Sequence, residues 1–262
     1  MAGLDGDLAL ALTKRVQQES CLVSVLIQDQ TRKTFAYREQ EVFPGASLLK
    51  IGIADYVKCA WEKNPEMLQE KLTVSPKQRV PGAGVMHHLS QNEWSLRDVL
   101  ALMLSTSDNT AANVLLDRFG RGNINDWLAE KYPDMQLQRY FIAPVVDGQD
   151  NFLTAEALLP AWQALFDGAN EFTQLCQTSL HEQTDRTKLV YYADVLQFVG
   201  DTFNKTGDLA NVEHDCARIQ LEQTWFDCVV LTKFDKATTQ HHAALKLQQD
   251  IGRLLLQKVM SE

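Results

Sequence analysis

Three short polar motifs in this chain contain the residue types that nucleophilic catalysis requires. They are Ser47-Leu48-Leu49-Lys50, Ser107-Asp108-Asn109 and Lys205-Thr206-Gly207. A serine hydroxyl is a weak nucleophile until a nearby base takes its proton, and a lysine three positions further on lies on the same face of a helix. Burial and a second cation both lower the pKa of a lysine. The spacing therefore predicts Ser47 as a nucleophile and Lys50 as its base, with Lys205 as the second cation.

The order of the motifs is more specific than any one of them. A Ser-x-x-Lys pattern arises by chance roughly once in a chain of this length, whereas each of the two tripeptides arises in only a few per cent of such chains, roughly. Each motif occurs once here. In this order they form the signature of class A β-lactamases and penicillin-binding proteins.

The chain resembles the penicillin-recognising serine hydrolases of the class A β-lactamase superfamily, and the resemblance spans most of its length. Residues 82–120 are similar to the family's helical pair around Ser-Asp-Asn, and residues 199–219 to its third and fourth strands. The resemblance implies an acyl-enzyme on Ser47. It also implies a β-lactam, or a peptidoglycan-like or ester compound, as the small-molecule partner.

The resemblance further implies roles for the residues around the nucleophile. Ser107 would relay a proton to the leaving nitrogen, and Asn109 would hydrogen-bond the amide of the substrate. Lys205 and Thr206 would hold a substrate carboxylate. The backbone N–H of Asp208 would be the second oxyanion donor, beside that of Ser47.

Four further residues have less specific roles. Gly207 is expected to let the substrate approach the backbone closely. His214 and Arg218, on or near the fourth strand, would supply a further cation for a substrate carboxylate, or would be paired surface residues. Asp108 is expected to stabilise its loop rather than to react, because short acidic side chains commonly bond nearby backbone.

One part of the family's chemistry is missing. Class A enzymes have a loop glutamate in a Glu-x-x-x-Asn motif, expected here between about residues 135 and 155, and the motif is absent. The nearby carboxylates, none of which can be assigned as a deacylation base, are Asp134, Asp147, Asp150 and Glu156. Three hypotheses stay open: a hydrolase of β-lactams or related carboxylate-bearing amides, which we rank first, a penicillin-binding trap or sensor, and an esterase or peptidase of the same fold.

The surrounding elements must bring these motifs together. Apolar periodicity predicts helices at 4–18, 48–61, 95–105, 109–118, 154–166 and in the last 25 residues, and strands at 22–27, 34–39, 198–207, 216–221 and 225–234. Strands at both ends with helices between them predict an α+β fold, in which an antiparallel sheet is flanked by the N- and C-terminal helices and an all-α lobe is inserted. We expect a sheet lobe at 1–45 and 191–262 and a helical lobe at 46–190, with the active site at their interface.

Composition limits the class of partner. The 262 residues include 34 acidic and 25 basic side chains, giving a net charge of -9 that disfavours nucleic acid. No apolar stretch is long enough for a membrane span, and the start of the chain lacks the positive charge of a secretory signal. We expect a monomer without cofactor or metal that is cytoplasmic as given, or secreted or periplasmic if an export signal precedes it. The five cysteines are expected to be reduced and mostly buried.

Overall fold

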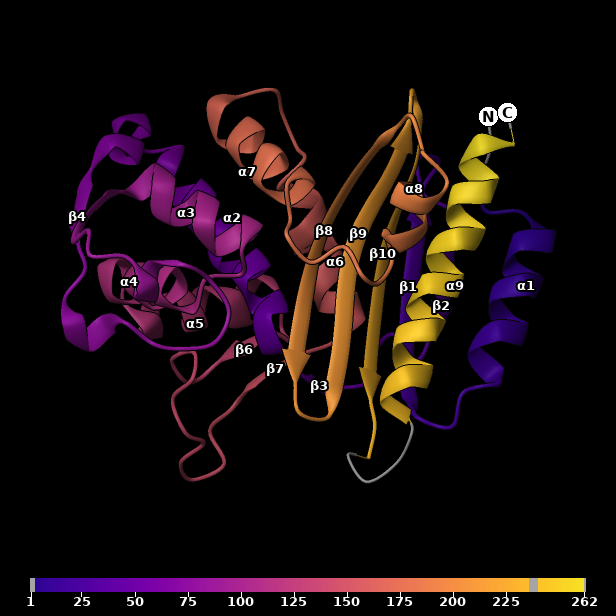
Figure 1. Cartoon of the computed structure of the whole chain (residues 1–262), viewed down its shortest axis with the longest axis horizontal. Helices are drawn as coiled ribbons and strands as arrows, with labels where there is room; N and C mark the ends of the chain where they lie inside the picture. Colours follow the sequence, from indigo (N-terminus) through magenta and orange to yellow (C-terminus); the bar gives the residue numbers. More distant parts are fainter. Residues whose placement is uncertain (1–2, 236–239, 262) are drawn as a thin grey trace.

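The computed structural model describes residues 3–235 and 240–261, and Figure 1 shows their arrangement. The helices are α1 Gly6–Gln17, α2 Leu49–Trp61, α3 Leu96–Ser105, α4 Asn109–Phe119, α5 Arg121–Lys131, α6 Ala155–Ala164, α7 Glu171–His181, α8 Tyr191–Val195 and α9 Gln240–Met260. The strands are β1 Leu22–Asp29, β2 Thr34–Tyr37, β3 Phe43–Pro44, β4 Lys71–Thr73, β5 Glu93–Ser95, β6 Gln136–Leu137, β7 Asn151–Leu153, β8 Asp201–Leu209, β9 Val212–Leu221 and β10 Thr224–Lys233.

The main sheet joins the two ends of the chain. Its strand order is β2-β1-β10-β9-β8, and every neighbouring pair is antiparallel. Strands β1 and β10 are paired from Leu22 opposite Lys233 to Asp29 opposite Phe226. The predicted α+β fold, with one antiparallel sheet and flanking terminal helices, is therefore confirmed.

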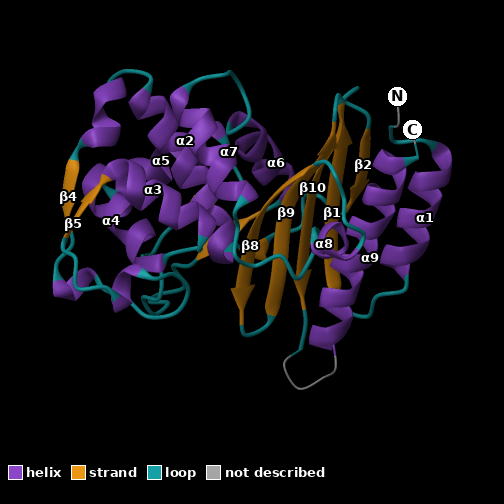
Figure 2. Cartoon of the chain, turned by 45° about the horizontal axis from the view of Figure 1, so that its top comes forward, coloured by secondary structure: helices purple, strands orange, loops and turns teal. Residues whose placement is uncertain are grey.

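The two faces of the sheet are covered by different helices. Helices α1 and α9 lie side by side over one face, on the right of Figure 1, where α9 contacts β9 and β10. Helix α6 contacts β1 and β10, and α7 contacts β8. Side chains alternate across β1, so that Val25 and Ile27 belong to the apolar cluster of α1 and α9 and Leu26 to the cluster of the remaining helices. Figure 2 shows the sheet between these two groups of helices.

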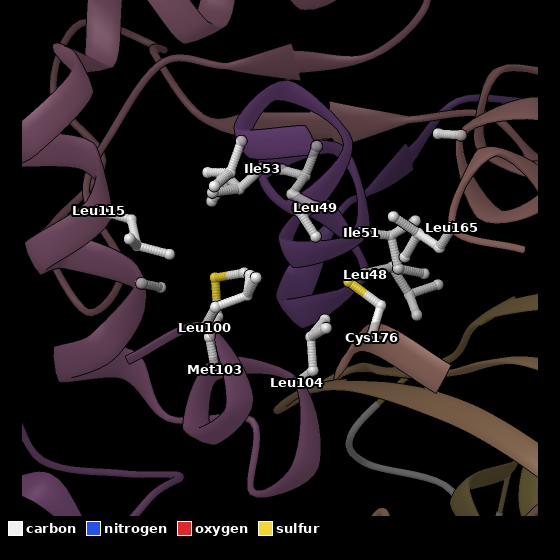
Figure 3. Packing of buried hydrophobic residues seen from close by; sticks show 14 of the residues in the cluster. Leu48, Leu49, Ile51, Ile53, Leu100, Met103, Leu104, Leu115, Leu165 and Cys176 are labelled. Carbon is white, nitrogen blue, oxygen red and sulfur yellow. The ribbon is translucent and has the colours of Figure 1, made fainter. Parts of the chain in front are cut away.

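Helix α2 is the centre of the helical part. Nine of its residues are buried, and its apolar side chains pack against α3, α4 and α7, as Figure 3 shows for Leu49, Ile51 and Ile53. A helix that is apolar nearly all round is stable only when it is covered on all sides. This packing fixes the helix that directly follows Ser47.

The sequence range predicted as a helical lobe contains more than helices. Four strands of two or three residues, β4 to β7, lie within it and form parts of two small sheets. Helix α6 belongs to the same range, yet it covers the main sheet. The division of the chain into lobes at residues 46 and 190 stays a prediction.

Candidate active site

A cavity of about 500 Å³ lies between the exposed edge of the sheet and the helices. Strand β8 is the last strand of its sheet and forms one wall with Thr206, Asp208 and Leu209. The other walls come from residues 46–47, 82–84, 106–107, 109, 139, 141–142, 151 and 183–185. The three sequence motifs thus meet at one cavity, although they are up to about 160 residues apart in the chain.

Ser47 lies in a short 3-10 turn, Ala46–Leu48, that leads into α2. Its hydroxyl Oγ is 3.1 Å from Lys50 Nζ, the arrangement expected for two residues on one helix face. Ala46 has a positive φ of 45°, which is an unfavourable backbone conformation for a residue with a side chain. The turn is therefore held by its surroundings, with the serine half-buried at the cavity wall.

Lys50 is completely buried, and its Nζ lies within hydrogen-bond distance of four oxygens. Besides Ser47 Oγ, these are Asn109 Oδ1 at 2.8 Å and the carbonyl and hydroxyl oxygens of Ser107. An ammonium has three N–H groups, so it donates to at most three of these oxygens at once. Burial is the largest cause that lowers the pKa of Lys50 well below the usual value, and the nearby cation of Lys205 lowers it further. Both effects favour the uncharged amine, which is the form that could take a proton from Ser47.

Ser107 connects the two lysines. Its hydroxyl accepts a hydrogen bond from Lys205 Nζ at 2.8 Å and lies 3.3 Å from Lys50 Nζ. Ser107 also has a positive φ of 55°, and its carbonyl is bonded by Lys50. Backbone strain of this kind persists only where neighbouring contacts maintain it. Ser107 is therefore placed to receive and pass on protons beside Ser47.

Asp108 has a structural role, as the sequence predicted. Its Oδ1 accepts from the backbone N–H of Ala111 at the start of α4, and its Oδ2 accepts from the N–H groups of Val85 and Met86. A Cβ on Gly84 would lie 2.2 Å from Asp108 Cγ, so this glycine permits the close approach. The carboxylate thereby ties α4 to the loop that forms the 82–84 wall.

The end of β8 presents Thr206 and Asp208 to the cavity. Because β8 has a strand partner on one side only, alternate backbone N–H groups point away from the sheet. The expected role of Gly207 in substrate approach stays a prediction, and the structure adds a packing role. A Cβ at this position would lie 3.2 to 3.3 Å from Leu48 Cγ and Ala46 Cβ, so the missing side chain lets β8 pack against the turn of Ser47.

The structure does not bring His214 and Arg218 to the cavity, which corrects the expectation of a further substrate cation. Both ring nitrogens of the buried His214 are bonded, to the Pro44 carbonyl at 2.8 Å and the Thr232 N–H at 3.1 Å, and burial lowers its pKa to about 4. Arg218 pairs with Asp227 at 2.7 and 2.8 Å. Its guanidinium carbon lies over the ring of Phe166 at 3.9 Å. The alternative of paired surface residues describes Arg218, whereas His214 is paired but completely buried.

Residues 135–155, where the family glutamate is expected, bring an aromatic ring to Lys50. Lys50 Nζ lies 4.7 Å from the centre of the Phe141 ring, which also lines the cavity. Within residues 3–235 and 240–261, no carboxylate is hydrogen-bonded to Lys50 or Ser47. Asp150 is occupied by Arg139 at 2.6 Å.

Sequence reasoning did not identify Phe141, Arg139 or Asn151 as residues of the site. Asn151 is held by two hydrogen bonds to the backbone of Arg139, so both residues form one rigid part of the cavity wall. A single phenylalanine or arginine in a loop has no distinguishing pattern in the sequence. The sequence did draw attention to the region that contains these three residues, because the glutamate motif expected there is absent.

Other kinds of site find less support in the described part of the chain. No group of three or more His, Cys, Asp or Glu side chains is arranged to hold a metal ion there. No helix among these residues has the length and hydropathy needed to cross a bilayer. All five cysteines are unpaired, and four of them are buried.

Comparisons with known proteins agree with this geometry. Residues 7–259 match the family model described as the Beta-lactamase enzyme family. A β-lactamase from Sphaerobacter thermophilus has a similar structure, with 25% identity, a TM-score of 0.84 and 98% of each chain covered. A mutant of PBP-A, solved as an acyl-enzyme complex with penicillin G, has the same fold at 20% identity and a TM-score of 0.82, covering 96% of this chain and 95% of that one.

A curated relative matches a shorter part of the chain. Beta-lactamase L2 from Stenotrophomonas maltophilia is 28% identical over 95 residues, which are 36% of this chain and 31% of that protein. The match to this relative therefore spans about a third of its length. Because the family model covers nearly the whole sequence, the conclusion rests on that model together with the shared fold: this chain belongs to the β-lactamase enzyme family.

Proposed function

We propose that this protein is a serine hydrolase that becomes acylated on Ser47 by β-lactams and related carboxylate-bearing amides, and that it releases the acyl group slowly. The observation that carries the proposal is the position of Lys50 Nζ, 3.1 Å from Ser47 Oγ and 3.3 Å from Ser107 Oγ. One uncharged amine can thus take the proton of the nucleophile and pass it to a second hydroxyl.

Acylation then proceeds in two steps. Ser47 Oγ attacks the carbonyl carbon of the substrate while its proton moves to Lys50, and the negative oxygen is held by the backbone N–H groups of Ser47 and Asp208. The bond to the leaving nitrogen breaks as Ser107 gives it a proton, which Lys50 replaces. Lys205 holds the Ser107 hydroxyl and, with Thr206, binds a carboxylate or carbonyl of the substrate.

The apolar wall of the cavity suits the acyl part of the substrate. Phe141 and Ile142 line the cavity, so an aromatic or aliphatic acyl group can bury apolar surface against them. This wall also supports slow deacylation. Hydrolysis needs a water activated by a base, and the ring of Phe141 lies beside Lys50 where no described carboxylate is bonded.

The test combines intact mass with turnover of a chromogenic cephalosporin. We expect penicillin G to add its mass to the wild-type protein once, and the cephalosporin to give a burst equal to the protein concentration followed by slow turnover. Ser47→Ala should give neither the adduct nor the burst while keeping its circular dichroism. An adduct that persists in Ser47→Ala would refute the assignment of the nucleophile, and rapid sustained turnover would refute slow release.

A further inference from the structure

Two acidic residues face each other next to the β8–β9 turn. The turn consists of residues 210–211, and Leu209 is paired with Val212 beside it. The preceding pair is Asp208 opposite Glu213. In an antiparallel ladder, pairs that exchange backbone hydrogen bonds alternate with pairs that do not, and the pair that closes a two-residue turn exchanges them. The backbone N–H of Asp208 therefore points away from β9, while its side chain lies close to that of Glu213.

Lys188 holds both carboxylates. Its Nζ forms an ion pair with Asp208 and another, at 2.7 Å, with Glu213, and it donates to the His214 carbonyl at 3.2 Å. Only 2% of its side chain is exposed, so water screens these contacts little. Charge-assisted hydrogen bonds of this kind are strong and fix the groups that make them. Lys188 thus ties the segment 185–190 to both strands of the hairpin.

One cation and one shared proton keep the two acidic side chains together. Burial and a hydrogen bond to Asp208 raise the pKa of Glu213. Burial opposes ionisation of Asp208 as well, but the Lys188 cation outweighs it and the pKa of Asp208 is lowered. Like charges directly opposite each other destabilise a strand pair, so this arrangement depends on both the proton and the lysine. The other titratable groups that face the pair or Lys188 are Lys205 from β8, His214 and Asp215 from β9 and His241 from α9.

The two donors proposed to hold the oxyanion lie on different elements, whose spacing must be kept. Gly207 packs against the turn of Ser47, because a Cβ on this glycine would lie 3.2 Å from Leu48 Cγ. Side chains alternate along a strand, so Asp208, the next residue, directs its carboxylate to the other face of β8. Lys188 holds the carboxylate there. The N–H of Asp208 is therefore fixed from both faces of the strand.

We infer that Lys188 is a positioning residue for the acylation of Ser47, because it keeps Asp208 and Glu213 together and thereby fixes the backbone N–H of Asp208. This inference rests on the proposed function and adds a residue that the proposed mechanism does not use. Without the cation, two carboxylates stay opposite each other at the end of an edge strand, and their repulsion separates β8 from β9. An oxyanion donor is effective only within hydrogen-bond distance of the developing charge.

Lys188→Met tests the inference with p-nitrophenyl phenylacetate, a neutral ester. Because this ester has no carboxylate, lost attraction between Lys188 and a substrate anion cannot slow its reaction. The Ser47 oxygen bonds the acyl carbon, the ester C–O bond breaks, p-nitrophenolate leaves, and the serine proton goes to Lys50. We expect the acylation rate constant at saturating ester to fall about tenfold or more, while the ester concentration that gives half the maximal rate changes little. Lys188→Arg should retain most of the rate, because arginine keeps the cation.

The repulsion requires both carboxylates to be ionised, which gives a readout in pH. The ratio of the Lys188→Met rate to the wild-type rate should fall between roughly pH 5 and pH 7, because Glu213 loses its proton while Lys205, with a pKa of about 8, stays charged. Adding Glu213→Gln to Lys188→Met leaves one carboxylate and an amide that can donate to it. In this double variant the ratio should recover and become independent of pH.

Lys58→Met is the matched control for the loss of a buried lysine. Lys58 donates to the backbone carbonyls of Ala164 and Asp167 and lies outside the cavity lining. This variant should be acylated at the wild-type rate. A wild-type rate in Lys188→Met would overturn the inference, and so would a slow reaction that neither pH nor Glu213→Gln changes. If Lys188→Met does not fold, the double variant decides, because slow acylation of the folded double variant contradicts the inference as well.

Amide hydrogen exchange tests the same inference without a substrate. The N–H of Leu209 belongs to the pair that closes the turn, and it should exchange about tenfold faster in Lys188→Met than in wild type or Lys58→Met. If wild type is acylated by neither the ester nor penicillin G, the proposed function fails, and the exchange rates then stand alone. Equal exchange in the three proteins would show that Lys188 does not hold the end of the hairpin.

Discussion

In the proposed mechanism the two lysines beside Ser107 have different tasks, and this predicts the pH profile of acylation. Lys50 would have to be uncharged to take the proton of Ser47, and its pKa lies well below the usual range because the side chain is buried. The rate should therefore rise with pH below the ordinary lysine pKa of about 10.4. Lys205 must be charged, and burial lowers its pKa to about 8. The rate should fall again as the pH exceeds this value.

This profile is obtained by stopped-flow measurement of the acylation rate with penicillin G between roughly pH 5 and pH 10. Because Lys50 and Lys205 interact, the apparent pKa values of the rising and falling limbs describe the pair of lysines together. Lys205→Arg is the informative variant, because arginine keeps its charge throughout this range. It should lose the falling limb near pH 8 while retaining the rising one. A falling limb at the same pH in Lys205→Arg would show that another group causes it.

Phe141 is the residue that we expect to make release of the acyl group slow. Its ring lies 4.7 Å from Lys50 Nζ, so a carboxylate at this position would be close enough to activate water beside the acyl group. We expect Phe141→Glu to raise the deacylation rate about tenfold or more. Phe141→Leu is the control, because it removes the ring without adding a base. The rate is measured from the loss of the acyl adduct by intact mass.

Equal deacylation rates in the two Phe141 variants would mean that lost packing, rather than a new base, is responsible. The backbone contacts of residue 141 should survive both substitutions, because they involve its N–H and carbonyl and the side chain of Asn113.

The sequence predicted the proximity of those residues that lie only a few positions apart in the chain. Ser47 and Lys50 share one helix turn, and Ser107 and Asn109 flank one helix start, so their proximity needs little knowledge of the fold. His214 and Arg218 were assigned less well, because their partners lie on other strands and are set by strand pairing rather than by local spacing. Thr232 and Pro44 bond the histidine from another strand and another part of the chain.

The carboxylate of Asp108 holds both the start of α4 and the 82–84 wall of the cavity. Asp108→Ala removes the N-cap of α4 and both hydrogen bonds to the Val85 and Met86 N–H groups. We expect a loss of about 2–4 kcal/mol in the free energy of unfolding, measured with urea. Acylation by penicillin G should also slow markedly, because the loop no longer holds its place beside Asn109.

The matched control is Asn170→Ala at α7. Asn170 caps its helix in the same way, by accepting from the Thr173 N–H at 2.9 Å, but it does not line the catalytic cavity. This variant should lose about 1 kcal/mol of stability with little change in acylation. If both variants slowed acylation equally, the specific role of Asp108 in shaping the wall would be contradicted.

Most elements were predicted where apolar periodicity is strong and missed where it is weak. Helix α7 is an exception, because it was missed although its buried residues Phe172, Leu175, Cys176 and Leu180 have helical spacing. Helices α2, α3, α4 and α9 follow their predicted ranges closely. Helix α5 was not predicted, since only Ile124 and Leu128 of its residues are buried and the rest of its surface is polar. Strands β6 and β7 were also missed, because two or three residues are too few for an alternating pattern.

At the scale of the whole molecule, the sheet followed from strands at both ends of the sequence, because the two groups of strands can pair only if the chain ends meet. The position of the connecting segment 185–190 did not follow from any pattern. It lies against β8 and β9 through the buried carboxylate of Asp215, which accepts from the Leu189 N–H at 3.0 Å and from Asn204 Nδ2 at 3.3 Å. Such a contact depends on tertiary structure alone.

Asp215 also couples the stability of the molecule to pH. Burial raises its pKa to about 8, although the two hydrogen bonds oppose this shift, so the folded state binds a proton that the unfolded state has already lost near neutral pH. Because the pKa of Asp215 is raised in the folded state, the group makes its full contribution to stability below its unfolded pKa of about 4. This contribution is lost as the pH rises toward 8. Through this group, the free energy of unfolding of the wild-type protein should therefore fall by about 1–3 kcal/mol between roughly pH 5 and pH 7.5.

Asp215→Asn isolates this effect, since asparagine has nearly the shape of a protonated aspartate and does not titrate. Its amide can still accept from Leu189 and can donate to Asn204 Oδ1, which has no partner among the described residues. Urea unfolding at the two pH values should show a smaller loss of stability in the variant than in wild type. Parallel pH dependence in the two proteins would mean that Asp215 is ionised when folded, and that the segment before α8 is held by a buried charge.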